Sequence, residues 1–236
     1  MENRFAEDLE VFQKWSLYDI VIHLNYMHHR EMNSMLRACA GQVAHRLRVL
    51  DLGCGDGRMA IEGLKGLSVE SYTGVDLSED ALATARGELP RICRDVKLLH
   101  CDLEHVLDQD WKEKPNFIIA SYSLHHFPHD SAKRIIQKVS QVLAPRGVFF
   151  WIDLQRYEYE TRQEYLDRFW RNHLPNWKAL DESQKTSVIE HMSKADYPLT
   201  SNEKRNLVNN AGLVWRSTPY QTPEYACDII GFGDPV

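Results

Sequence analysis

The feature that most constrains the fold is the stretch 48–58, which reads RVLDLGCGDGR. Its apolar run ends in the carboxylate of Asp51. Three glycines follow at alternate positions: Gly53, Gly55 and Gly57. This pattern is typical of a buried parallel strand that breaks into a tight turn before a helix. Because glycine adopts backbone angles that other residues avoid and has no side chain, a ligand can lie directly against such a turn.

The glycine spacing differs from the dinucleotide-binding fingerprint G-x-G-x-x-G, because the third glycine comes one residue early. This difference disfavours a dehydrogenase. A second acid, Asp76, follows Gly57 by 19 residues, close to the roughly 20-residue spacing of the acid that binds ribose hydroxyls. A carboxylate accepts hydrogen bonds from both hydroxyls of a vicinal diol. We therefore expect Asp76 to bind a ribose; alone, it could equally be a helix-entry residue, and the turn could bind nothing.

The segment around this turn alternates between apolar runs typical of strands and amphipathic stretches typical of helices. Such repeated βα units imply a parallel sheet with helices on both faces. Ser78 is expected to cap one helix, and Asp130 or Ser131 another. The expected strands are 47–52, 70–76, 96–101, 117–121 and 147–153.

The alternation stops after Asp153. Residues 155–211 contain no convincing strand, and helices are expected at 157–173 and 182–194. A capping box, Thr200-x-x-Glu203, begins a third helix that Gly212 could end. Strand character returns at 213–216 and 226–232, and we expect the last strand to be antiparallel.

Residues 5–40 have helical periodicity, with one break expected near Ser16. This segment could be a solvated face carrying salt bridges. The alternative is a lid over the ligand cleft, with Tyr26, His29 and Arg30 turned inward.

The composition limits the class of protein. The net charge is −6, from 28 basic and 34 acidic residues, and no basic run occurs, so nucleic acid is an unlikely partner. The five cysteines form no close pair, as in proteins of a reducing compartment. No secretory signal and no membrane span is visible. We expect a soluble, cytoplasmic protein; its oligomeric state is open.

Four segments together resemble the class I S-adenosylmethionine (SAM)-dependent methyltransferases: 49–57, Asp76, Asp102-Leu103 and 121–127. The resemblance implies an α/β fold with a doubly wound, mainly parallel seven-stranded sheet, in which the last strand lies between the fifth and sixth. It also implies a single domain that is divided into a helical lid (1–45), a SAM-binding core (46–154), a helical insertion between strands five and six (155–211) and terminal strands (212–236).

Carried over residue by residue, the resemblance places the methionine part of SAM on Asp51, with Ser121 and Tyr122 closing that side. Asp76 would bind the ribose, and Asp102 would accept a hydrogen bond from the adenine amino group. The complete cofactor-binding set that it implies is Asp51, Gly53, Cys54, Gly55, Gly57, Asp76, Leu77, Asp102, Leu103, Ser121 and Tyr122.

Some subtypes are excluded by missing motifs. An Asn/Asp-Pro-Pro-Tyr segment after the fourth strand would mark transfer to a base amino group, but this chain has Ser-Tyr-Ser-Leu. A Pro-Cys nucleophile is also absent. A methyltransferase acting on a small molecule remains, with oxygen or nitrogen preferred over carbon or sulfur as the acceptor atom. The alternatives are a tRNA-modification enzyme, such as a carboxy-SAM synthase (suggested by the segment 182–185) or a tRNA methyltransferase, and a non-catalytic SAM-binding module.

An oxygen or nitrogen acceptor can need a positioned base. The candidates for this role are His191, His126, Asp153 and His29, with His125 also considered. We expect His191 near the transferred methyl. The candidates for substrate binding are Tyr26, Tyr157, Asp196 and Tyr197. No metal is expected, because His125, His126, His129 and Asp130 lack a tight ligand spacing.

Overall fold

The computed structural model describes residues 15–43 and 46–233. Seven strands follow one another in the order β3-β2-β1-β4-β5-β8-β7, and a short eighth strand, β6, pairs with β5. The strands are β1 (Leu47–Leu52), β2 (Val69–Asp76), β3 (Val96–His100), β4 (Phe117–Ser121), β5 (Val148–Arg156), β6 (Leu199–Thr200), β7 (Val214–Gln221) and β8 (Tyr225–Gly231).

Strands β1 to β5 pair in parallel, and β1 lies between β2 and β4. Asp51 on β1 is level with Gly74 on one side and Ile119 on the other. The expected ranges of these five strands are confirmed to within three residues, whereas β7 extends five residues beyond the expected 213–216. Because the strands are parallel, their carboxyl ends meet at one edge of the sheet, where ligands of open α/β sheets bind.

Strand β8 is antiparallel and lies between β5 and β7, as the resemblance implied. Strand β6 was missed by the sequence analysis. It has only two residues, and it pairs in parallel with Gln155 and Arg156 at the end of β5. A strand this short has no detectable alternation of apolar and polar residues.

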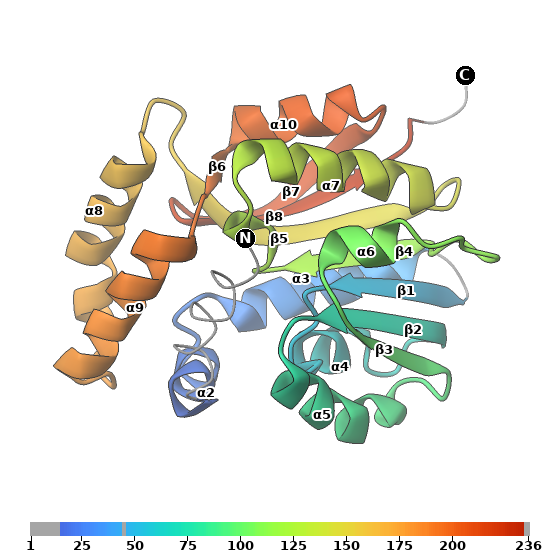
Figure 1. The fold of residues 1–236 in the computed structure, drawn as a ribbon, viewed down its shortest axis with the longest axis horizontal. Coiled ribbons are helices and arrows are strands. Elements are labelled where there is room, and N and C mark those ends of the chain that lie inside the picture. Colours follow the sequence, from blue (N-terminus) through green and yellow to red (C-terminus); the bar gives the residue numbers. More distant parts are fainter. Residues whose placement is uncertain (1–14, 44–45, 234–236) are drawn as a thin grey trace.

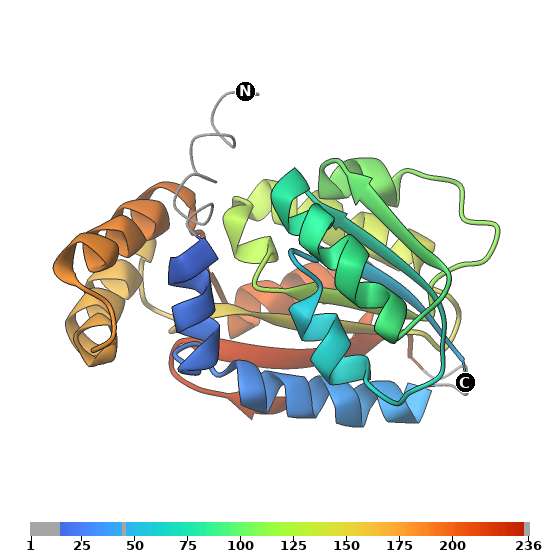
Figure 2. The ribbon, with the colours of Figure 1, turned by 90° about the horizontal axis from the view of Figure 1, so that it is seen from below.

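The helices cover both faces of the sheet (Figures 1 and 2). Buried side chains of α3, α4 and α5 share one core cluster, and those of α6, α7 and α10 share the other. The helices are α2 (Trp15–His23), α3 (His29–Val43), α4 (Arg58–Leu64), α5 (Glu79–Glu88), α6 (Leu103–Leu107), α7 (His129–Val142), α8 (Arg162–Asn172), α9 (Glu182–Ala195) and α10 (Ser201–Asn210), with short 3-10 turns η1 (Leu89–Arg91), η2 (Leu124–His126) and η3 (Leu174–Asn176).

Two predicted caps are confirmed and one is wrong. Ser78 accepts a hydrogen bond from Ala81 N, and Thr200 and Glu203 form the capping box of α10. Helix α7 begins earlier than expected, with Pro128 as its N-cap and no side-chain cap. The fixed φ of proline already suits a helix start, so Asp130 falls in the first turn instead of capping it.

The N-terminal helical region breaks at 24–28, between α2 and α3; this break was not predicted, and the one expected near Ser16 falls at the edge of the described residues. Asn25 and His28 have left-handed φ angles of 58° and 59°, which Asn and His adopt more readily than most residues. Arg30 is exposed and donates to the His23 carbonyl, so its predicted inward orientation is wrong. The rest of the expected helix, residues 5–14, lies outside the described residues.

Residues 157–211 separate into two parts. Helices α8 and α9 lie beyond the carboxyl ends of the parallel strands (Figure 1). Helix α10 contacts α7 and β7 and therefore covers a face of the sheet. Helix α8 begins at Arg162, later than expected, because Thr161 and Glu164 form a capping box there.

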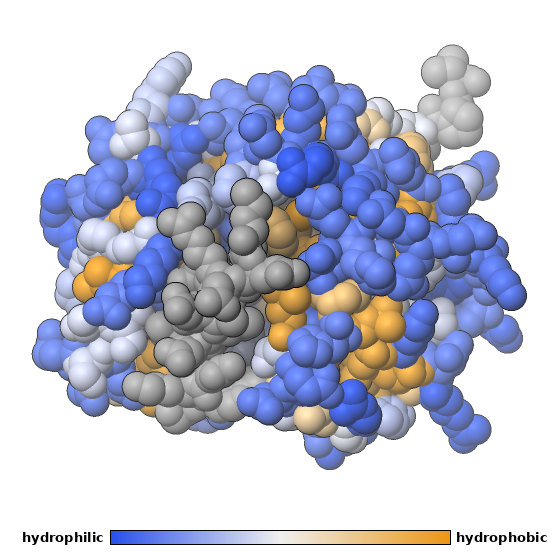
Figure 3. Space-filling model, in the orientation of Figure 1, coloured by the Kyte–Doolittle hydropathy of each residue, from blue (hydrophilic) through white to orange (hydrophobic). Residues whose placement is uncertain are grey.

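Most of the surface in Figure 3 is hydrophilic, with apolar side chains exposed in patches between the charged ones. Leu77, directly after β2, is an exposed apolar residue. Within residues 15–43 and 46–233, no helix combines the length and the apolar character that crossing a bilayer requires.

Candidate functional site

The turn after β1 is shaped by its glycines. Gly53, Gly55 and Gly57 have φ angles of 78°, 53° and 77°. A Cβ atom on Gly53 would lie 2.5 Å from Ser123 Cβ, so no side chain fits there. A Cβ atom on Gly55 would have no heavy atom within 4 Å. The backbone at Gly55 therefore faces open space, where a ligand can approach it closely.

Asp76 is tied to this turn. Its carboxylate accepts hydrogen bonds from Gly55 N at 2.8 Å and from Ser78 N at 2.9 Å. Burial raises the pKa of Asp76, while the backbone N–H groups of Ser78 and Gly55 oppose the rise. The two bonds fix the carboxylate at the end of β2, beside the open space at Gly55.

Asp51 lies deeper, at the end of β1, and is only 2 % exposed. The Tyr72 hydroxyl donates a hydrogen bond to its carboxylate at 2.7 Å. Burial raises the pKa of Asp51 to about 7, although the Tyr72 bond opposes the rise. A cationic ligand group beside Asp51 would favour its ionised form.

A cavity opens above the turn, and helices α2 and α3 form its other wall. Two polar side chains of α3 point unsatisfied atoms into this region: within the described residues, Asn33 Oδ1 and both ring nitrogens of His29 are buried without a hydrogen bond. Burial, with Arg58 nearby, lowers the pKa of His29 to about 4. The residues lining the cavity are Tyr18, Ile22, His29, Asn33, Asp51, Gly53, Cys54, Gly55, Asp56, Arg58, Met59 and Ser121.

Tyr122 joins the loop after β4 to the break between α2 and α3. Its φ angle is 52°, and its hydroxyl donates to the Met27 carbonyl. Its ring centroid lies 5.0 Å from that of His29. Tyr122 therefore holds the helical lid against the end of β4.

The residues predicted for the adenine side lie at the next strand ends. Asp102 is exposed and caps α6, accepting from His105 N at 2.8 Å. Leu103 is buried, and Leu77 is 37 % exposed. The contacts of all three with adenine remain predictions.

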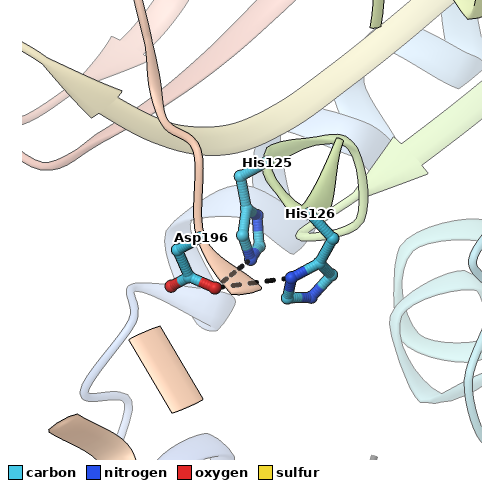
Figure 4. A group of neighbouring side chains, drawn as sticks. All are labelled: His125, His126 and Asp196. Carbon is cyan, nitrogen blue, oxygen red and sulfur yellow. Dashed lines mark ion pairs between the residues drawn. The ribbon is translucent and has the colours of Figure 1, made fainter. Parts of the chain in front are cut away.

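A second group of polar side chains, which we call the imidazole–carboxylate cluster, consists of His125, His126, His191 and Asp196. Three imidazole nitrogens surround Asp196 Oδ1 (two of them in Figure 4). The distances are 3.7 Å from His125 Nε2, 3.4 Å from His126 Nδ1 and 3.7 Å from His191 Nε2. All except His126 are buried.

Asp153 supports this cluster from the end of β5. Its carboxylate binds His125 Nδ1 and also accepts a hydrogen bond from Trp151 Nε1 at 2.9 Å. Burial lowers the pKa of His125, but the charges of Asp153 and Asp196 outweigh burial and raise it above its ordinary value. Asp153 is only 1 % exposed, and its partner in the cluster is His125; its role as a base remains a prediction.

Strand β6 explains how Asp196 reaches the cluster. Its pairing with β5 brings the chain just before Leu199 alongside the end of β5. Tyr197 N donates to the His125 carbonyl, and the Arg162 guanidinium binds the Asp196 carbonyl at 2.6 Å. Asp196 and His191 were both expected to face the cleft. Their proximity to each other was not expected, because β6 was not predicted.

The remaining predicted substrate residues lie farther out. Tyr26 stacks on Trp177, with ring centroids 5.1 Å apart, and its hydroxyl accepts from Ala179 N. Tyr157 is 52 % exposed, and Arg168 covers its ring at 4.2 Å. The Tyr197 ring lies under Arg162. Their roles in substrate binding remain predictions.

Comparison with known proteins identifies the domain. Residues 49–147 match a family model described as a methyltransferase domain. The chain is a SAM-dependent methyltransferase. It is 23 % identical over 219 residues to a carboxy-SAM synthase of Campylobacter fetus subsp. fetus, covering 91 % of this chain and 90 % of that protein.

Solved methyltransferase structures share the fold. The structure of DhpI with S-adenosylhomocysteine (SAH) covers all of both chains at 17 % identity with a TM-score of 0.66. The plantazolicin methyltransferase BpumL with SAH has a TM-score of 0.66 at 13 % identity, covering 96 % of this chain and 94 % of that one.

The cavity fits the SAM that this methyltransferase uses. The unsatisfied atoms of His29 and Asn33 can accept hydrogen bonds from a polar ligand. Asp51 offers a carboxylate for its ammonium group, and the open space at Gly55 leaves room beside Asp76. The sequence did not single out Tyr18 and Asn33, which lie in helices with no ligand-binding motif, or Arg58, which directly follows the glycine turn.

Proposed function

We propose that this enzyme transfers a methyl group to an oxygen or nitrogen atom of a small-molecule acceptor. One observation carries the proposal: the loop 121–126 joins the two polar regions. Ser121 lines the cofactor cavity, and His125 and His126 carry the imidazole–carboxylate cluster. An acceptor between the two would meet hydrogen-bonding groups suited to an O–H or N–H.

When bound, SAM supplies a methyl group on a positively charged sulfur and leaves as SAH. The acceptor lone pair forms the new bond to carbon as the carbon–sulfur bond breaks, and the net reaction releases the acceptor's proton. The protein aligns the reacting atoms and excludes water. Asp51, Asp76 and the turn hold the donor, and Tyr122 closes the lid over it. His126, the most exposed member of the cluster, is the group that contacts the acceptor.

The test uses SAM with a deuterated methyl group and a fractionated metabolite extract, with products detected by mass spectrometry. We expect the label in a small molecule as an ether, ester or amine, together with SAH. His126→Ala should keep its SAM affinity and lose turnover. The matched control is His129→Ala, an exposed histidine three residues further along that should retain turnover. Label found only on carbon, or only in tRNA, would contradict the proposal.

A second candidate is a carboxy-SAM synthase, favoured by the similarity to such an enzyme over 91 % of this chain. It predicts that incubation with the extract converts SAM to a carboxylated SAM that mass spectrometry detects. Accumulation of that product without SAH would replace the first proposal with this one.

A further inference from the structure

The environment of Asp196 is unusual for a buried carboxylate. Asp196 is 3 % exposed, and its Oδ1 atom makes no hydrogen bond among the residues that the structure describes. Leaving a buried charged acceptor unsatisfied costs more than the net gain of an ordinary hydrogen bond. Yet imidazole nitrogens from two neighbouring residues, His125 and His126, point at this oxygen (Figure 4).

The position of the proton on His125 decides whether this residue can satisfy Asp196 Oδ1. Its Nδ1 atom faces the Asp153 carboxylate, and that carboxylate is itself held by the Trp151 indole. Nδ1 therefore carries the proton that it donates to Asp153. In the neutral ring, the lone pair of Nε2 then points toward Asp196 Oδ1, 3.7 Å away. In that neutral state two electron-rich atoms face each other, and either a proton on Nε2 or a metal ion between the two atoms relieves the repulsion.

We propose that His125, His126 and Asp196 form a binding site for a divalent transition-metal ion of the zinc type. The ligating atoms are His125 Nε2, His126 Nδ1 and Asp196 Oδ1, which all lie within 4.8 Å of one another. Imidazole and carboxylate groups are ligands of Zn²⁺ at about 2.0–2.2 Å. Calcium and magnesium prefer all-oxygen ligand sets, so the two imidazoles select against them.

The distances agree with such a site. Two atoms bound tetrahedrally to Zn²⁺ lie about 3.3–3.4 Å apart, given the metal–ligand distances above. His126 Nδ1 and Asp196 Oδ1 are 3.4 Å apart, and His125 Nε2 and Asp196 Oδ1 are 3.7 Å apart. The contact of His126 Nδ1 with the Ala195 carbonyl, at 3.4 Å, is longer than a normal hydrogen bond. Metal binding therefore requires the loss of only a weak contact.

The residues around the proposed ligands are of the kind that orient ligands in metal sites. Metal-binding histidines commonly donate their second N–H to a carboxylate, which fixes the ring and raises its basicity, and Asp153 does this for His125. With three protein ligands, the ion keeps one open position. The His126 side chain is 29 % exposed, so a water molecule or the acceptor heteroatom can reach that position. The metal site goes beyond the proposed function. It can be tested independently, because metal binding is measurable without an acceptor.

The experiment measures metal binding directly. Tag-free protein is stripped with a chelator and titrated with Zn²⁺ by calorimetry, and with Co²⁺ by visible absorption, which reports the geometry of the ion. We expect about one ion per chain. Asp196→Asn and His126→Gln should each weaken binding more than tenfold. Asp153→Asn should weaken it about 10- to 100-fold, as for other residues that orient a ligand.

Two controls separate this result from a folding defect. His129→Ala, in the neighbouring exposed segment, should bind metal as the unaltered protein does. Each variant should also retain its SAM affinity, which shows that the fold is intact and tests the cofactor site separately. If the unaltered protein does not bind about one metal ion per chain, the proposal is wrong. A proton shared between an imidazole and Asp196 then takes the place of the ion. Equal metal affinity in Asp196→Asn and His126→Gln would also overturn it.

Discussion

Replacement of Asp76 by alanine should weaken SAM binding strongly. The carboxylate lies at the end of β2, held by Gly55 N and Ser78 N, where it can also accept from the ribose hydroxyls. Hydrogen bonds to a charged group contribute about 1.5–3 kcal/mol each. Loss of one such bond to the ligand corresponds to a roughly 10- to 150-fold weaker affinity. Isothermal titration calorimetry with SAM and SAH measures this change.

The variant also leaves two backbone N–H groups without their acceptor, so its stability has to be measured as well. Asp76→Asn keeps one carbonyl oxygen and should show an intermediate affinity. The matched control is Asp80→Ala, which removes an exposed acid from the first turn of α5, the helix that follows Asp76. An Asp76→Ala protein that is folded at the assay temperature and binds SAM as tightly as Asp80→Ala does would refute the ribose role.

Three further predictions concern stability, each read from urea denaturation. Gly53→Ala should lower the free energy of unfolding by at least about 1–2 kcal/mol, because residue 53 has a left-handed φ. Gly87→Ala, in open space near the end of α5, should raise it by up to about 1 kcal/mol. Burial raises the pKa of Asp51 from 3.8 to about 7. The protonated carboxyl therefore contributes its full stability below about pH 4, and this contribution is lost as the pH rises to about 7. Over this pH range, the stability of Asp51→Asn should increase relative to that of the unaltered protein. Lys204 and Asp228 form a buried ion pair at 3.3 Å. Lys204→Met should lower the free energy of unfolding by about 3–5 kcal/mol, because Asp228 then keeps the Thr218 hydrogen bond but loses its counter-charge. The double variant with Asp228→Leu should recover part of the loss.

The parallel core was predictable because its signals are local. The apolar run before Asp51, the glycines of the turn and the capping residue Ser78 each determine the structure of their own segment. Their positions at strand ends follow from the parallel arrangement, since consecutive carboxyl ends share one edge. The positions of these residues at the strand ends could therefore be predicted before the fold was known, whereas their cofactor-binding roles came from the family resemblance.

The imidazole–carboxylate cluster could not be assembled in this way. His125 and Asp196 are separated by more than seventy residues, and they meet because a two-residue strand pairs with the end of β5. The ligand set that we propose for a metal ion was not foreseen for the same reason: the residues considered, such as His129 and Asp130, are close in sequence, whereas Asp196 comes from the insertion. The break in the lid at 24–28 was missed because Asn25 and His28 interrupt the helix through their backbone angles, which apolar periodicity does not reveal.

The position of β8 has a consequence for synthesis of the chain on the ribosome. Strand β5 is buried along nearly its whole length, and one of its edges pairs with β8, which is translated about seventy residues later. Until then, the edge of an apolar strand stays open to pairing with other chains. Completion of the sheet therefore waits for the last strand, and a nascent chain stopped after β7 is the form of this protein most prone to aggregate.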